Sequence, residues 1–446
     1  MASAPLEDAV VVGLSPAEAL ERVQRSGMIV CLGVPLGLEF GIDLRSYSVG
    51  PRFGGVKMVP TRGVHFVACG TELSTTGLFI QLAEAEVCVL RWDTDTEVLQ
   101  LVEDSAAAEP HVAAARGMRS DSGLGAYPLA TEAQWRALSA HVTPAVLERA
   151  AIPLGALLAP EGIDEAALEA EIDRLERARS GADEVASGAR PSRRAPPMGP
   201  HPEPAPSDIH GAKFVQLDPR TSGRGRSGAA LSRFHLDRSE WLDELLATDY
   251  AEAATGAAGG GCVAADAEME ESGSDDADAD ADGATDRGAG GATVAARRGV
   301  ALAPAERALL GELQLAFVLF LRLASLRALE QWKALVDLLS SCESALVERG
   351  PLYAALLATV RAQLELAPAD LLDGEGLTGE NNFLRTALGR LARAAVEAGE
   401  TVPPRVAEEL NQLQRLVGER FGLTLEALGE EEDDEDAPMV VEEESA

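Results

Sequence analysis

The N-terminal fold is decided by residues 49–67, which read VGPRFGGVKMVPTRGVHFV. Two short apolar runs, Val56–Val59 and Val64–Val67, lie here between glycine and proline residues. Runs of this length, rich in valine and phenylalanine and bounded by turn formers, are typical of β-strands rather than helices. Three further runs of the same kind are Met28–Leu32, Leu78–Leu82 and Val87–Leu90. The sequence therefore predicts a β-rich, sandwich-like domain over residues 1–160.

Helical spacing of apolar residues takes over further along the chain. Residues 131–147 predict one or two helices that close the first domain, with Trp135 as a packing anchor. Within Pro304–Leu323, leucine and phenylalanine recur every three or four residues, which predicts a buried stripe (Leu309, Leu310, Leu313, Phe317, Phe320, Leu321). Other predicted helices are Ser239–Thr248, Leu326–Glu348, Tyr353–Leu364, Asn382–Ala398 and Pro404–Phe421. We therefore predict an all-α domain over residues 211–425, and an α+β chain of two domains.

Three low-complexity segments separate or follow these domains. Residues 161–210 are predicted to hold one helix and then a linker, because they become dense in proline, glycine and serine and cannot bury enough apolar surface to order themselves. Residues 252–298, rich in glycine and then in aspartate, predict a disordered insertion within the helical domain. Residues 426–446 form an acidic tail with a short segment that is able to become a strand.

The charge of the chain excludes several classes of partner. It has 73 acidic and 38 basic side chains, for a formal net charge of -35. Such a field repels nucleic-acid phosphates and anionic lipid surfaces, so we expect neither direct nucleic-acid binding nor membrane binding. The five cysteines include no C-x-x-C pair, which argues against a disulfide framework or a thiolate zinc site. Acidic residues in Met1–Asp8 do not fit a secretory signal, so we expect a soluble protein inside the cell.

The segment Gly50–Lys57 is similar to a phosphate-binding loop. That motif needs lysine directly after its last glycine, and then serine or threonine for magnesium. Here Val56 comes between Gly55 and Lys57, and Met58 follows. A glycine-rich turn between two strands is the better interpretation, and a nucleotide-dependent hydrolase is kept as the alternative.

No other motif predicts chemistry. The tract Asp278–Gly283 resembles the first half of a calcium loop, but Ala289 stands where a bidentate glutamate is needed. The histidines show no metal-binding spacing, and His65, on a predicted strand, is expected to be a structural histidine with satisfied hydrogen bonds. We therefore predict no catalytic residue, no metal and no cofactor.

The tail holds the one candidate binding segment. After seven consecutive acidic residues, Ala437-Pro-Met-Val-Val441 is an apolar island. A short extended segment of this kind can satisfy its backbone by adding a strand to the edge of a partner's sheet. The predicted partner-binding residues are Pro438, Met439, Val440 and Val441. A solubilising acidic tail is the alternative.

Several motifs, in order along the chain, resemble the AAR-two family of splicing factors. They are Gly33–Asp43, Val49–Pro60, Gly63–Phe66, Val89–Trp92, Gly125–Pro128 with Trp135, Leu309–Val318, Glu330–Leu335 and Asn382–Leu384. The resemblance implies a β-rich domain followed by a helical domain similar to VHS domains. It also implies a non-enzymatic assembly factor of the U5 small nuclear ribonucleoprotein, found in cytoplasm and nucleus.

The partner also comes from the resemblance alone. It is the large scaffold protein of the U5 particle, bound at its RNase H-like and Jab/MPN-like domains so that the U5 helicase does not join too early. A generic acidic chaperone, acting only through the tracts of 252–298, is a third hypothesis. The sequence leaves the oligomeric state open.

Overall fold

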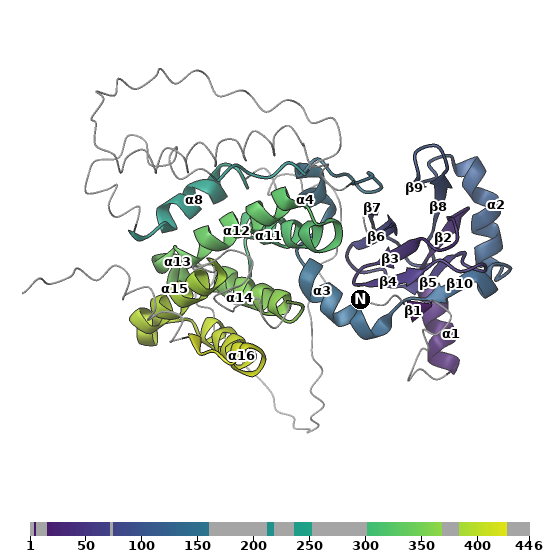
Figure 1. Cartoon of the computed structure of the whole chain (residues 1–446). Helices are drawn as coiled ribbons and strands as arrows, with labels where there is room; N and C mark the ends of the chain where they lie inside the picture. Colours follow the sequence, from purple (N-terminus) through teal and green to yellow (C-terminus); the bar gives the residue numbers. More distant parts are fainter. Residues whose placement is uncertain are drawn as a thin grey trace, which may run out of the picture. The chain divides into compact units, whose positions relative to one another are not determined.

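The computed structural model describes residues 4–5, 16–71, 75–159, 212–217, 236–251, 301–367 and 383–425 (Figure 1). The chain divides into two compact units. The first unit comprises residues 1–132, 147–213 and 319–328, and the second comprises residues 133–146, 214–318 and 329–446. Every described strand belongs to the first unit, and the regular secondary structure described for the second unit is helical. The predicted α+β fold, with a β-rich part and a helical part, is confirmed.

Two five-stranded sheets build the first unit. The first sheet has the order β1 (Ala4–Pro5), β4 (Arg45–Ser48), β3 (Glu39–Ile42), β6 (His65–Gly70) and β7 (Thr75–Ile80). The second has the order β10 (Leu124–Ala126), β5 (Gly55–Val59), β2 (Gly27–Leu32), β8 (Val87–Asp93) and β9 (Val98–Leu101). One hydrophobic core takes residues from both sheets, including Ile29 and Leu90 from one and Phe40 and Leu78 from the other. The sheets therefore bury their facing sides together, as a sandwich does.

Helix α2 (Ser105–Arg116) covers the outer side of the second sheet (Figure 1). Its Ala115 packs in a small cluster with Val30 and Val89. Asp104 caps this helix, because its side chain accepts a hydrogen bond of 2.9 Å from the amide of Ala106. The first unit also holds α1 (Pro16–Arg25).

The helices of the remaining chain are α3 (Glu132–Ser139), α4 (Pro144–Arg149), α8 (Ser239–Ala247), α11 (Pro304–Leu323), α12 (Leu326–Ser340), α13 (Glu343–Glu348), α14 (Gly350–Leu364), α15 (Phe383–Ala398) and α16 (Pro404–Phe421). The bounds of α11 match the prediction, but its burial does not. Leu315, Ala316 and Val318 are buried together with four residues of the predicted stripe, whereas Phe320 is only partly buried and Leu321 is 39% exposed. Every residue from 308 to 319 is buried, so the buried set is wider than one stripe.

The predicted helix Leu326–Glu348 is wrong as a single element. It breaks between α12 and α13, where the Ser341 hydroxyl donates to the carbonyl of Asp337 (2.7 Å). Asp237 then caps the second helix by accepting from the amide (3.2 Å) and hydroxyl (2.5 Å) of Ser344. Serine side chains and a carboxylate from a distant segment therefore replace the helical hydrogen bonds at this point.

Candidate functional site

The predicted partner-binding residues Pro438, Met439, Val440 and Val441 lie outside the described residues. Their role in strand addition stays a prediction. The aspartate tract Asp278–Gly283 and the linker over 161–210 lie outside as well.

The glycine-rich segment Gly50–Lys57 turns the chain from β4 into β5. Gly55 has a φ of 129°, and a Cβ added there would clash with the carbonyl oxygen of Ile29 on the neighbouring strand. Only glycine fits this close approach. A phosphate loop leads into the N-terminus of a helix, whereas this turn leads into a strand, as the sequence predicts.

Lys57 forms an ion pair with Asp121, with Nζ 2.5 Å from Oδ1. Its backbone carbonyl also accepts a hydrogen bond from the amide of Tyr127 (2.9 Å). In a nucleotide site this lysine would have to reach phosphate oxygens. Here its charge joins β5 to the turn before β10.

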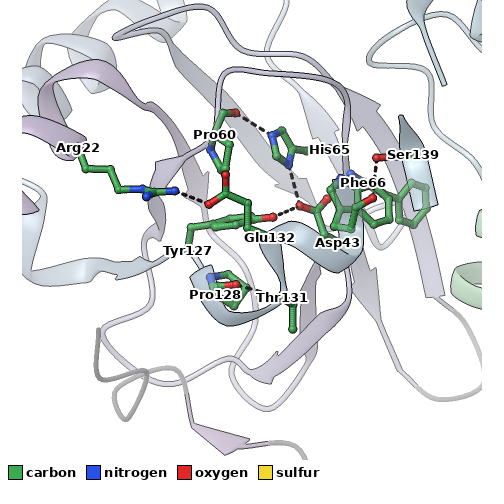
Figure 2. A network of polar contacts seen from close by, with 11 residues as sticks. Arg22, Asp43, Pro60, His65, Phe66, Tyr127, Pro128, Thr131, Glu132 and Ser139 are labelled. Carbon is green, nitrogen blue, oxygen red and sulfur yellow. Dashed lines mark hydrogen bonds and ion pairs between the residues drawn. The ribbon is translucent and has the colours of Figure 1, made fainter. Parts of the chain in front are cut away.

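A buried polar network lies inside the first unit (Figure 2). The carboxylate of Asp43 faces Nδ1 of His65 at 2.7 Å, and the same oxygen accepts from the Tyr127 hydroxyl at 2.5 Å. Its other oxygen accepts from the amide of Phe66 at 2.9 Å. Nε2 of His65 lies 2.7 Å from the carbonyl oxygen of Pro60. Asp43, His65 and Tyr127 are each at most 1% exposed.

These contacts determine the charge of His65. The carbonyl of Pro60 can only accept, so Nε2 must carry a proton. Asp43 accepts from an amide and a hydroxyl and lies 2.7 Å from Nδ1, which favours a proton on that nitrogen too. The contacts therefore favour the imidazolium form. Burial by itself lowers the pKa of His65, but the charge and hydrogen bond of Asp43 outweigh it and leave the pKa raised.

The network has the geometry of a structural tie. Asp43 adopts a φ of 51° in the turn after β3 and there joins β6 to the segment after β10. Because the ring and the carboxylate are buried, a substrate in solution has no access to them. The prediction that His65 is a satisfied structural histidine is confirmed. Burial and the negative charge of Asp43 also raise the pKa of Tyr127.

A second charged residue of the first unit lies near this network. The guanidinium of Arg322 lies over Gly41, where a Cβ would clash with its Nη2, and 3.4 Å from the Ser46 hydroxyl. Burial lowers the pKa of Arg322, and the charges of Asp43 and Glu39 offset part of that effect. The absence of a side chain at Gly41 on β3 therefore makes room for the guanidinium of Arg322, which is partly buried.

The charged groups of the second unit also pair within the protein. Asp337 binds Arg238 at 2.7 Å and Arg390 at 2.8 Å, and Arg349 joins Asp243 (2.7 Å) to Glu306 (2.8 Å). The pair of Arg349 with Asp243 involves α8, and the pair of Arg390 with Asp337 joins α15 to α12. They are ties between helices rather than groups turned toward a ligand.

A shallow cavity of about 200 Å³ lies between α15 and α16. Its lining includes Ala392, Val396, Leu410 and Leu425, with Asn411 and Gln414 as its polar members. It has no acid, base or nucleophile, so it is suited to contacts with apolar groups and not to catalysis. Within the described ranges, no three histidine, cysteine or carboxylate side chains come together in a way that would hold a metal ion. No described helix is both long and apolar enough to cross a membrane.

Comparisons with known proteins identify the family. The model of the AAR2 N-terminal domain matches residues 25–152, and the model of the AAR2 C-terminal repeat region matches residues 214–426. The chain belongs to the AAR2 family. The human protein AAR2 homolog is 27% identical over 391 residues, which cover 84% of this chain and 85% of the human protein. The Caenorhabditis elegans protein AAR2 homolog is 25% identical over 413 residues, covering 89% of this chain and 95% of the relative. The resemblance drawn from the sequence is confirmed.

The AAR2 family matches place the network and the turn in one domain. Asp43, His65 and Tyr127 all lie within the match to the AAR2 N-terminal domain, as does the turn Gly50–Lys57. Sequence reasoning singled out His65 and Gly55 but gave no role to Asp43, because a lone aspartate between glycine-rich strands has no distinguishing pattern.

Proposed function

We propose that this chain is a non-enzymatic assembly factor of the U5 small nuclear ribonucleoprotein in pre-mRNA splicing. The observation that carries the proposal is membership of the AAR2 family, with both family domains matched in order along the chain. AAR2 family proteins act as splicing assembly factors, which supports the coarse role. The buried network and the paired Lys57 agree with it, since both serve the fold.

The proposed partner is the large scaffold protein of the U5 particle. The chain would bind its RNase H-like and Jab/MPN-like domains and delay entry of the helicase. The net charge of -35 supports a protein surface as the target rather than RNA, because phosphates would be repelled. We propose that the protein acts in both cytoplasm and nucleus, which a fluorescent fusion would test directly.

The tail is proposed to supply one part of the interface. Val440 lies within the apolar segment Ala437–Val441, and strand addition would use its backbone amide. A Val440→Pro substitution removes this donor without changing charge. The matched control is Val440→Thr, which keeps the amide, the branched shape and the strand propensity.

The experiment is a titration of the full chain against the scaffold's two C-terminal domains. We expect Val440→Pro to weaken binding about fivefold to tenfold, since one backbone hydrogen bond is worth ~1 kcal/mol, and Val440→Thr to bind nearly as the native chain does. Equal affinity of all three proteins would leave a solubilising tail as its role. A scaffold that binds none of them would refute the proposed partner.

The alternative function, a nucleotide-dependent hydrolase, is tested by nucleotide binding. Calorimetric titration of the full chain with ATP and with GTP should give no binding heat. Micromolar binding that Lys57→Ala abolishes would favour the alternative. Deletion of residues 252–298 tests the generic chaperone hypothesis, because loss of all partner binding on that deletion would support it.

A further inference from the structure

The second unit holds an extended segment of its own chain by the backbone. Residues 214–217 form neither helix nor strand, and both backbone groups of Val215 are bound by side chains. Its amide donates to Oε1 of Glu312 on α11 (2.9 Å), and its carbonyl accepts from Nε2 of Gln331 on α12 (3.0 Å). The same Nε2 donates to Oε1 of Glu312 (2.9 Å). Glu312 and Gln331 thus form a linked pair, called here the backbone clamp.

The clamp is coupled to an aromatic anchor. Phe214, directly before the bound residue, is 8% exposed. Hydrogen bonds to a backbone amide and carbonyl are available from almost any residue, whereas a buried aromatic side chain selects for size. The geometry therefore recognises an extended peptide with a large apolar residue, followed by any residue that has an amide hydrogen. Proline is excluded at that second position.

The clamp cannot be left empty without cost. Glu312 is only 2% exposed with the segment in place, and departure of the segment would remove the Val215 amide as one of its donors. A buried charged acceptor that loses a donor is strongly disfavoured. A peptide that brings another amide and another carbonyl can replace both hydrogen bonds of Val215, so its binding offsets the loss of the segment.

We propose that the backbone clamp is a peptide-exchange site. An extended segment of a partner protein, with an aromatic or large aliphatic residue followed by a non-proline residue, replaces residues 214–217 there. The chain's own segment is then an internal competitor, and its tether gives it a millimolar effective concentration that sets the partner's threshold. This inference goes beyond the role proposed above and its test uses no spliceosomal protein, so each can fail alone.

The test needs a chain whose own segment cannot occupy the clamp. The double substitution Phe214→Ala and Val215→Pro removes the anchor and the amide. The probe is a fluorescein-labelled peptide with the sequence of residues 210–219, and its matched control carries an N-methyl group on the valine, which removes only the amide hydrogen. We expect the probe to bind the doubly substituted full chain at least about tenfold more tightly than the native chain.

Two controls test the hydrogen bonds of the peptide amide and of the peptide carbonyl separately. N-methylation should weaken binding about tenfold or more, as expected for a hydrogen bond to a carboxylate. Gln331→Met, placed in the doubly substituted chain, should weaken it about fivefold, because it removes the donor to the peptide carbonyl. Equal binding of the two peptides, or no binding to a doubly substituted chain that melts as the native one does, overturns the proposal.

A measurement on the native chain covers the case in which the double substitution prevents folding. Hydrogen–deuterium exchange of residues 212–217 should accelerate at about 10 mM unlabelled peptide, above the effective concentration of the tethered segment. Unchanged exchange there overturns the proposal. A native dimer that dissociates when the peptide is added would assign the clamp to a second copy of the chain, and would overturn the assignment to a partner.

Discussion

Replacement of His65 by glutamine removes the imidazolium from the network of Asp43 and Tyr127. Glutamine is neutral, and its one amide group cannot donate to both Asp43 and the Pro60 carbonyl in the way that the ring does. Asp43 is fully buried and loses the cation beside it, while the Phe66 amide and the Tyr127 hydroxyl remain as donors. Breaking a buried ion pair by removing one partner typically costs ~3–5 kcal/mol. We expect a loss of this size in the free energy of unfolding at pH 6.

The pH dependence separates a charge effect from a packing effect. The pKa of His65 is raised in the folded state above the ordinary value near 6.5. Its contribution to stability is therefore fully present below about pH 6.5 and is lost as the pH rises through the folded pKa. Over that window His65 costs the native chain up to ~1.4 kcal/mol of stability per pH unit, and the variant lacks this contribution. The difference between the two proteins should shrink between pH 6 and pH 9.

The assay is urea unfolding at pH 6, 7, 8 and 9, followed by tryptophan fluorescence, since Trp92 lies in the core of the same unit. Burial and the charge of Arg307 lower the pKa of His141, but His141 is present in both proteins, so its effect cancels in the difference. A stability difference that stays constant from pH 6 to pH 9 would refute the imidazolium and leave only lost packing.

Three further predictions concern the close approach at Gly55, the hydroxyl of Tyr127 and the helix cap at Asp237. Gly55→Val should abolish soluble expression or lower the melting temperature by more than ~10 °C because of the clash with Ile29, whereas Lys57→Ala should cost no more than ~1 kcal/mol as a surface ion pair; equal losses would contradict this. Tyr127→Phe removes one hydrogen bond to Asp43 and should cost ~1.5–3 kcal/mol by urea unfolding, independent of pH between 6 and 9 because the pKa of Tyr127 is raised. Asp237→Ala removes the cap of α13 and should lower the free energy of unfolding by ~1–2 kcal/mol, measured by calorimetry. Asp237→Asn should restore part of that loss. Identical melting of the two variants and the native chain would refute the capping role.

The sequence predicted the elements whose own residues carry a strong periodic signal. Helices α11 and α16 have the predicted bounds, and the apolar runs around Val56 and Val64 became β5 and β6. The strands β3 and β4 were missed, because four residues such as Arg45–Ser48 contain no apolar run and are strands through pairing alone. Helix α2 was missed because its alanine-rich sequence with Pro110 lacks a strong apolar stripe.

The buried hydrogen bonds could not be predicted from local sequence patterns. Asp43 and Tyr127 stand 84 positions apart, and Val215 and Glu312 stand 97 apart, so only the folded chain brings them together. A single sequence shows each residue without its partner. Gly55 was predicted only as part of a glycine-rich turn, and its positive φ agrees with that, but its close approach to Ile29 appears only in the folded chain.

Asp43 and Glu312 are two buried carboxylates that each bind a backbone amide, but in segments of different kinds. Asp43 and Glu312 each accept a backbone amide and a side-chain donor, so both satisfy a buried charge in the same way. The amide that Asp43 holds is that of Phe66, fixed within β6 between β3 and β7, and it can exchange only when the sheet opens. The amide that Glu312 holds belongs to Val215, in a segment outside any sheet or helix. Hydrogen exchange should therefore be far slower at Phe66 than at Val215, and that difference is what makes the first carboxylate a permanent tie and the second a site that can change its ligand.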